Sequence, residues 1–406
     1  MCEVGELPPY SIVSLQTAAA NTSNSQAVQA TIIEDGEQPG TAILENSIIR
    51  AEFSLEGDLI RLYDKAARHE ILPAGASANI FQAFEDRPNA WDAWDIDIHY
   101  DDRMWLARPA DSIEVIEAGP LRASLFIRRR ILKSVINQKV SLAAESRRLD
   151  FETSIDWHDR HILLKVAFPV DVLSPVATYE IQWGNVQRPT HRNTSWDWAR
   201  FETAAQKWVD LSEGGYGVSL LNNGKYGHDI HDNILRLTLL RSPTNPDPQA
   251  DQGEHRFTYS LLPHLGSWDE HIISEAYFLN DPLIVRFDNH QSAITNQQAV
   301  QSLLFADSPN LVIETVKRAE DGHGVIVRLY ESQRRRGIGR LHFAFPVQEA
   351  WRTNLLEENQ ERLAVEDNTV VPDGMDVLNR TDVLNRSVMI SYKPYEIITL
   401  RIISRN

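Results

Sequence analysis

The sequence contains a single cysteine, Cys2, among 406 residues. One cysteine excludes an internal disulfide framework and a cysteine-based zinc cluster, and it favours a reducing compartment. No apolar run approaches the roughly 18 residues that a membrane-spanning helix needs, and no signal-peptide pattern follows Met1. These absences together predict a cytoplasmic protein.

Positive charge is also scarce. The chain has 40 Lys and Arg residues against 57 Asp and Glu residues, which gives a formal net charge of -17. Nucleic acids and anionic membranes need clustered basic residues, so both are excluded as expected partners. The two short basic runs, 128–130 and 334–336, are interpreted as solvated ends of strands. The 42% hydrophobic content is enough for a sizeable core, and the length predicts two or three domains.

The third thing missing is helical periodicity. No amphipathic run of helical length is evident, so a fold in which strands and helices alternate is not expected. Strand patterns recur instead, for example over Leu149–Trp157, where apolar and polar residues alternate. We therefore predict an all-β protein: a short β segment and linker over 1–40, a large antiparallel super-sandwich over 41–285, and a smaller C-terminal β-sandwich over 286–406.

The densest functional signal lies at Phe84–Asp97, which holds five carboxylates and two tryptophans in fourteen residues. Indole faces can stack on the C–H face of a sugar, while carboxylates accept hydrogen bonds from its hydroxyl groups. The expected binding residues are Trp91, Asp92, Trp94, Asp95 and Asp97. The alternative is that the tryptophans belong to the core and that the acids cap turns or pair with arginines.

A second cluster of Trp and Asp residues follows at Gly184–Trp198. It combines an Arg188-Pro189 turn with His191 and with the sequence Trp-Asp-Trp at 196–198. A binding segment is one interpretation, and a long ordered loop with buried indoles is the other.

A third motif covers Asn222–His231 and includes Tyr226. Its Asn-Gly dipeptide is the strongest short signal for a hairpin turn, so a turn is the first interpretation. His228, Asp229 and His231 could suggest a metal site, but on a strand the two histidines would face opposite ways. The chain has no phosphate-cradling glycine loop, no Gly-x-Ser-x-Gly elbow and no dinucleotide fingerprint.

Several stretches occur in an order that resembles the C-terminal, β-rich half of the family 38 glycoside hydrolases, which are retaining α-mannosidases. They are Glu85–Pro88 with Trp91–Asp97, Arg188–His191 with Asn193–Asp197, Lys207–Glu213, Asn223–Gly227, Leu239–Pro243, Glu314–Lys317 with Glu320–Gly322, and Tyr395–Leu400. The resemblance runs from about residue 5 to the C-terminus. It implies that the large super-sandwich is of the galactose-mutarotase-like type.

The resemblance also implies a function. Such enzymes act on α-mannosides and place most of their zinc ligands and their aspartate nucleophile in an N-terminal domain that has no counterpart here. We therefore expect no catalytic residue, metal ligand or cofactor in this chain, which alone should be inactive. The expected partners are a mannose-containing oligosaccharide and an N-terminal catalytic half or partner chain. The expected substrate-binding residues are Trp91, Asp92, Trp94, Asp95, Asp97, Arg188, His191 and Tyr226.

Two alternatives stay open at this point. One is an autonomous carbohydrate-binding β-sandwich protein without hydrolase activity. The other is a self-sufficient glycosidase that uses two of the five clustered carboxylates, which retention would place roughly 5–5.5 Å apart. Hydrolysis of an aryl mannoside by this chain alone would identify the second, and sugar binding without turnover would favour the first.

Overall fold

The structure is a computed structural model that describes residues 10–11, 27–33, 40–284, 302–367 and 386–404. The chain divides into two compact units. The first consists mainly of Ala20–Ile181 and Val186–Leu283, and the second mainly of Ile284–Asn406 with the short segment Gln182–Asn185. The expected strand near Pro8 falls almost wholly outside the described residues.

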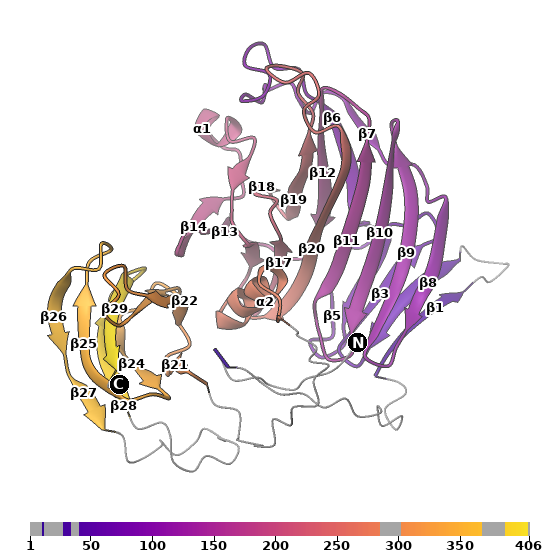
Figure 1. Ribbon diagram of the computed structural model, residues 1–406. Helices are drawn as coiled ribbons and strands as arrows, with labels where there is room; N and C mark the ends of the chain where they lie inside the picture. Colours follow the sequence, from indigo (N-terminus) through magenta and orange to yellow (C-terminus); the bar gives the residue numbers. More distant parts are fainter. Residues whose placement is uncertain (1–9, 12–26, 34–39, 285–301, 368–385, 405–406) are drawn as a thin grey trace, which may run out of the picture. The chain divides into compact units, whose positions relative to one another are not determined.

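The first unit contains three antiparallel sheets within its described residues (Figure 1). The largest has the order β14-β13-β16-β17-β20-β11-β10-β9-β8. Its strands are β8 (Ser112–Ala118), β9 (Arg122–Ile131), β10 (Ser134–Ala143), β11 (Leu149–Trp157), β13 (Val176–Ile181), β14 (Gly184–Pro189), β16 (Trp208–Ser212), β17 (Tyr216–Asn222) and β20 (Gly253–Leu265).

The two smaller sheets of this unit share its core. One has the order β15-β18-β19-β12-β6-β7 and the other the order β1-β2-β3-β4-β5. Their strands are β6 (Ile80–Glu85), β7 (Met104–Leu106), β12 (Ile162–Pro169), β15 (Thr203–Ala204), β18 (Gly227–His231), β19 (Ile234–Arg241), β1 (Val28–Ile33), β2 (Thr41–Asn46), β3 (Ile49–Ser54), β4 (Leu59–Asp64) and β5 (His69–Glu70). The predicted all-β super-sandwich is confirmed.

Alternating side chains explain why the sheets stack. On β11, Leu149, Phe151, Thr153, Ile155 and Trp157 are buried on the core side, while Asp150, Glu152, Ser154 and Asp156, which alternate with them, point the other way. Three rings bridge two sheets: Phe151 stacks on Tyr259 of β20 at 5.2 Å, and Phe168 of β12 lies 5.6 Å from Phe151. The core is therefore formed between the largest sheet and its smaller partners.

The second unit is a smaller β-sandwich, as predicted. In its described part, one sheet has the order β21-β24-β28-β27 and the other the order β22-β23-β29-β25-β26. Their strands are β21 (Leu304–Ala306), β24 (Gly337–Phe343), β28 (Arg386–Tyr392), β27 (Val365–Asp367), β22 (Leu311–Arg318), β23 (Val325–Glu331), β29 (Ile397–Ser404), β25 (Val347–Thr353) and β26 (Asn359–Leu363). A separate apolar core, which includes Leu329, Phe343 and Leu400, lies between them.

Two helices are present in the described residues, and the longer one lies where the sequence shows no clear amphipathic run of helical length. α1 (Ser195–Trp198) is a single turn, whereas α2 (Glu270–Asn280) runs for 11 residues and begins at the N-cap Asp269. α2 buries only Ile272, Ile273 and Ala276. Its apolar face is too narrow to produce a clear helical period in the sequence. In the described part of the chain, no helix has the length and apolarity needed to cross a membrane.

One local prediction was wrong. The expected linker contains β1, whose residue Val28 is buried in the core and which pairs antiparallel with β2; its polar surroundings concealed it. The chain turns at Asn223-Gly224 as predicted, although this turn does not close a hairpin. It lies between β17 and β18, which belong to different sheets, so the turn carries the chain from one layer to the other.

A closed ring of hydrogen bonds lies inside the core of the first unit. Asn79 donates to Gln138 (2.7 Å), Gln138 donates to the Tyr259 hydroxyl (2.8 Å), and that hydroxyl donates to Asn79 (2.8 Å). Gln138 also donates to Thr153 at 2.9 Å. All four residues are buried, so each partner satisfies a polar group that water cannot reach.

Breaking this ring should destabilise the protein. Tyr259→Phe removes one hydroxyl and leaves the amide groups of Gln138 and Asn79 short of a partner, which should cost roughly 1–3 kcal/mol of unfolding free energy. Urea denaturation measures it. Tyr226→Phe, at an exposed tyrosine, is the matched control and should change stability by less than about 0.5 kcal/mol. Equal effects of the two variants would contradict the role of the ring.

Candidate functional site

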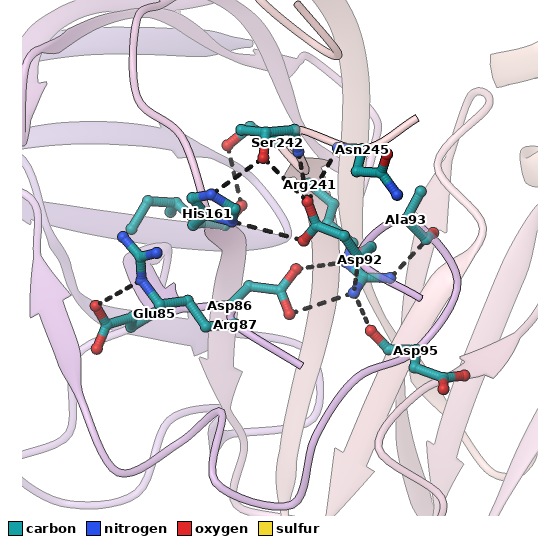
Figure 2. A network of polar contacts seen from close by, with 12 residues as sticks. Glu85, Asp86, Arg87, Asp92, Ala93, Asp95, His161, Arg241, Ser242 and Asn245 are labelled. Atoms are coloured by element: carbon teal, nitrogen blue, oxygen red, sulfur yellow. Dashed lines mark hydrogen bonds and ion pairs between the residues drawn. The ribbon is translucent and has the colours of Figure 1, made fainter. Parts of the chain in front are cut away.

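A buried ion pair joins the ends of two strands at the predicted binding loop. Asp86 directly follows β6 and is fully buried, and Arg241 is the last residue of β19. The Arg241 Nε lies 2.5 Å from Asp86 Oδ2, and its Nη2 lies 3.3 Å from Oδ1 (Figure 2). Burial raises the pKa of Asp86, while the Arg241 guanidinium acts in the opposite direction. The pair anchors the loop that begins at Arg87.

The same guanidinium also holds the backbone of that loop. Arg241 donates to the carbonyl oxygens of Asp92 (3.0 Å), Ala93 (3.3 Å) and Asp95. Figure 2 shows these carbonyl groups arranged around the arginine. One half-buried side chain therefore fixes three peptide groups of the Trp91–Asp97 segment. We call this arrangement the Arg241 clamp.

Asp92, which is predicted to accept a hydrogen bond from a sugar, is engaged within the protein. Its Oδ2 accepts from the backbone of Thr244 (2.7 Å) and Asn245 (3.1 Å), and its Oδ1 lies 3.5 Å from His161 Nδ1. Burial alone would raise the pKa of Asp92, but these hydrogen bonds and His161 outweigh it and hold that pKa below its ordinary value. The carboxylate stays charged and ties the Trp91–Asp97 segment to the loop after β19.

Both indoles of the loop lie at the surface, which excludes the alternative that they belong to the core. Trp91 is 68% exposed and Trp94 is 65% exposed, and their rings meet edge to face at 6.4 Å. Trp91 has φ +59°, a left-handed conformation that is rare for a bulky residue and that often marks functional sites. Asp95 is exposed and Asp97 half-buried. This surface is available for stacking and hydrogen bonding.

The second predicted segment, Arg188 to Trp198, forms a shallow hollow in the same unit. Arg188, His191, Arg192, Asp197 and Arg200 line it together with Asp229. The single-turn helix α1 begins with a capping box, in which Thr194 and Asp197 exchange hydrogen bonds. Trp196 and Trp198 are exposed, which excludes the alternative of buried indoles in this segment as well.

A buried polar network lies under these loops, and sequence reasoning missed it. Leu164 and Val166 of β12 point into the main core, so Lys165 points to the outer face of its sheet. Lys165 is fully buried, with Nζ 3.7 Å from Glu202 and 3.9 Å from Asp229. Its Nζ forms no hydrogen bond to a described residue. A lysine inside the apolar run Leu163–Val170 was the available signal.

An aromatic cluster on that outer face brings the two predicted segments together. Phe84, Tyr100 and Leu163 are buried there, and Ile96 and Phe201 pack against them. The Tyr100 ring lies 5.5 Å from Phe84 and 5.7 Å from Phe201. Tyr100 ends the tryptophan loop and Phe201 follows α1, so the two segments meet over β12 and β6.

The third motif is split between surface and interior. Tyr226 is exposed, whereas His228 is fully buried and its Nδ1 lies 3.2 Å from the Tyr226 carbonyl oxygen. Asp229 is bonded by Arg192 (3.4 Å) and Arg236 (3.2 Å). His231 lies instead beside Asp232. Within the described ranges, no three His, Cys, Asp or Glu side chains are placed so that they could hold a metal ion.

The exposure of the indoles gives a prediction with a matched pair of tryptophans. Trp94→Ala should change unfolding free energy by less than about 1 kcal/mol, because little buried surface is lost. Trp157→Ala, at a tryptophan with 0% exposure, should cost roughly 3–5 kcal/mol. Denaturant midpoints measure both. A large loss of stability in Trp94→Ala would show that this indole is part of the core after all.

His228 gives a prediction for acid stability. Burial lowers its pKa from the ordinary 6.5 to about 4, with a smaller effect of the Lys165 charge, although the Tyr226 carbonyl acts in the opposite direction. As pH falls, His228 therefore binds a proton in the unfolded chain at a higher pH than it does in the folded chain. Stability is fully present above pH 6.5 and is lost towards pH 4, by roughly 3 kcal/mol.

The measurement is the urea midpoint between pH 4 and 8. His228→Gln should lose most of this pH dependence, whereas His158→Gln, at an exposed histidine, should keep it. An unchanged slope in His228→Gln would contradict the prediction.

Comparison with known proteins identifies the family. The glycosyl hydrolases family 38 C-terminal domain matches residues 44–249, and the glycosyl hydrolases family 38 C-terminal beta sandwich domain matches residues 310–400. Alpha-mannosidase 2C1 of Mus musculus is 42% identical over 82% of this chain and 32% of its own length. Alpha-mannosidase G of Dictyostelium discoideum is 35% identical over 80% of this chain and 31% of its own length.

A solved structure supports the fold. An alpha-mannosidase from Enterococcus faecalis V583 superposes with a TM-score of 0.66 at 20% identity, covering 91% of this chain and 43% of that one. The chain spans about a third of the length of the curated relatives it matches. More than half of its residues match C-terminal domains of a single family, in the order in which the two units occur. The chain belongs to glycosyl hydrolase family 38, and its two units are C-terminal domains of that family.

Proposed function

We propose that this chain forms the C-terminal, β-rich part of a retaining alpha-mannosidase and completes the carbohydrate-binding cleft of that enzyme. The family match and the alpha-mannosidase relatives support the enzyme class. The proposed substrate is a mannose-containing oligosaccharide. The proposed partner is an N-terminal catalytic part, on the same or on another chain, and the proposed compartment is the cytoplasm.

The observation that carries this proposal is the Arg241 clamp. It fixes the backbone of the Trp91–Asp97 loop from the protein side, while the two indoles on the solvent side remain largely exposed. A loop that served only to cover the core would bury these rings. A backbone held rigid under exposed aromatic faces loses little entropy on binding, which is what a preorganised sugar site needs.

The individual roles follow from the geometry. Trp91 and Trp94 stack on the apolar faces of sugar rings, and Asp95 and Asp97 accept hydrogen bonds from hydroxyl groups. Tyr226, which directly precedes β18 of the sheet that contains β6, offers an exposed ring. Asp92 orients the loop through Thr244 and Asn245. Arg188 and His191 line the neighbouring hollow and contact more distant parts of the ligand.

We propose that the zinc ion of the enzyme is held by its N-terminal part and not by this chain. The resemblance implies a zinc ion and an aspartate nucleophile in the N-terminal part of such enzymes. The described residues here offer no set of His, Cys, Asp and Glu side chains that fits a metal ion. We therefore assign no step of the reaction to a metal held by these two units.

The self-sufficient glycosidase is less well supported. Of the five clustered carboxylates, Asp86 is buried against Arg241 and Asp92 is bonded by Thr244 and Asn245. Glu85 faces Arg87 (3.2 Å) and Arg103 (3.4 Å). Such engaged groups cannot serve freely as acid and nucleophile. The autonomous binding protein has the same loop geometry in its favour, but the alpha-mannosidase relatives favour the enzyme.

The test combines this chain with an N-terminal part of the enzyme, supplied from the same gene or from a relative. The combination should hydrolyse an aryl α-mannoside, while this chain alone should not. Trp94→Ala should lower kcat/KM by up to about tenfold, since stacking of an aromatic ring contributes roughly 1 kcal/mol to the free energy of binding. Its thermal midpoint should stay near that of the wild type.

The control is Phe278→Ala, at an exposed aromatic residue on α2, and it should leave activity unchanged. Two results would overturn the proposal. One is turnover by this chain alone that survives a chelator and is lost in Asp95→Asn. The other is an activity of Trp94→Ala that falls only in proportion to its folded fraction.

A further inference from the structure

The hollow beside α1 has a charge pattern that recognition of a neutral sugar does not require. Three arginines, Arg188, Arg192 and Arg200, line it against two carboxylates, Asp197 and Asp229. The chain as a whole carries a net charge of -17. A local excess of positive charge on an acidic protein points to a local anionic ligand.

Both carboxylates are already paired with cations other than Arg188. Asp229 lies 3.4 Å from Arg192, 3.2 Å from Arg236 and 3.9 Å from the buried Lys165. Asp197 accepts from Thr194 and also faces His191 and Arg200. Neither carboxylate pairs with Arg188, the remaining arginine of the hollow.

The Arg188 side chain has no hydrogen-bond partner in the portion of the chain that is described. Its Nε is buried and unsatisfied, and its guanidinium lies 6.0 Å from the centre of the Tyr179 ring. The backbone beside it is fixed, because Thr190 donates to the carbonyl oxygens of Pro175 (3.1 Å) and Ser174 (2.8 Å). A buried donor without a partner is costly, so this guanidinium is placed for an acceptor that the chain itself does not provide.

We propose that this hollow is an anion subsite in which Arg188 binds a carboxylate or phosphate group carried by a small ligand. A planar guanidinium matches such oxyanions with two parallel hydrogen bonds. Arg192 and Arg200 add positive potential at the rim. The subsite rests on the geometry of the hollow alone, so it does not depend on whether the chain works on mannosides.

The experiment titrates the purified 406-residue chain by calorimetry with inorganic phosphate, mannose 6-phosphate, glucuronate and mannose. Phosphate, mannose 6-phosphate or glucuronate should bind, and Arg188→Gln should weaken that binding by about tenfold or more, as expected for one charge-assisted pair. Tighter binding of mannose 6-phosphate or glucuronate than of phosphate supports an anionic sugar as the source. Equal binding of phosphate supports a free anion.

The matched control is Arg128→Gln, which removes the same charge from an exposed position on β9, distant from β14 in the strand order. It should bind like the wild type. Absence of anion binding, or equal weakening by both variants, would overturn the subsite. Phosphate binding by this chain that is lost in the full enzyme would also overturn it, because a carboxylate of the rest of the protein would then fill the hollow. None of these results bears on the hydrolysis test above.

Discussion

The pair between Asp86 and Arg241 is the interaction on which the proposed binding face depends. The two residues lie at the ends of β6 and β19, and β12 pairs with both of these strands. Asp86 is fully buried, so removing Arg241 would leave a buried negative charge, which is costly. The same arginine binds three carbonyl groups of the loop. Loss of one side chain would therefore release both the strand ends and the tryptophan segment above them.

The outer face of the smaller sheet explains why so many polar groups are buried in this region. The inner face of β12 packs on the main core, while its outer face carries Leu163 and Lys165. Gln82 and Thr238 are opposite Lys165 in the neighbouring strands. The two long loops cover this face with Tyr100, Phe201 and Glu202. A polar network under a loop restricts it to one arrangement more strictly than an apolar contact would, because each donor needs its own acceptor.

The sequence predicted the β architecture, because strand periodicity is a local signal, and it marked both Trp/Asp segments as candidate sites, because clusters of aromatic and acidic residues are local signals too. It did not predict the pairing of Asp86 with Arg241, which are 155 residues apart, since composition says nothing of such a contact. Nor did it separate Asp92, whose carboxylate binds Thr244 and Asn245, from the exposed Asp95. Burial and partners distinguish these two roles, and both arise only when distant strands pair.

Some charged groups of this region are paired within the protein and others are not, and this difference supports a ligand-binding face rather than a loop that only covers the core. Asp86 and Asp92 are engaged within the protein, which leaves Asp95 and Asp97 as the acceptors beside the indoles. In the neighbouring hollow, Arg192 and Arg200 have carboxylate partners, whereas the Nε of Arg188 has none among the described residues. Internal ion pairs and hydrogen bonds thus fix the backbone, and the charged groups that take no part in them lie at the surface. A preorganised ligand site requires both features: internal pairs that hold the backbone, and donors, acceptors and aromatic faces that have no partner within the protein.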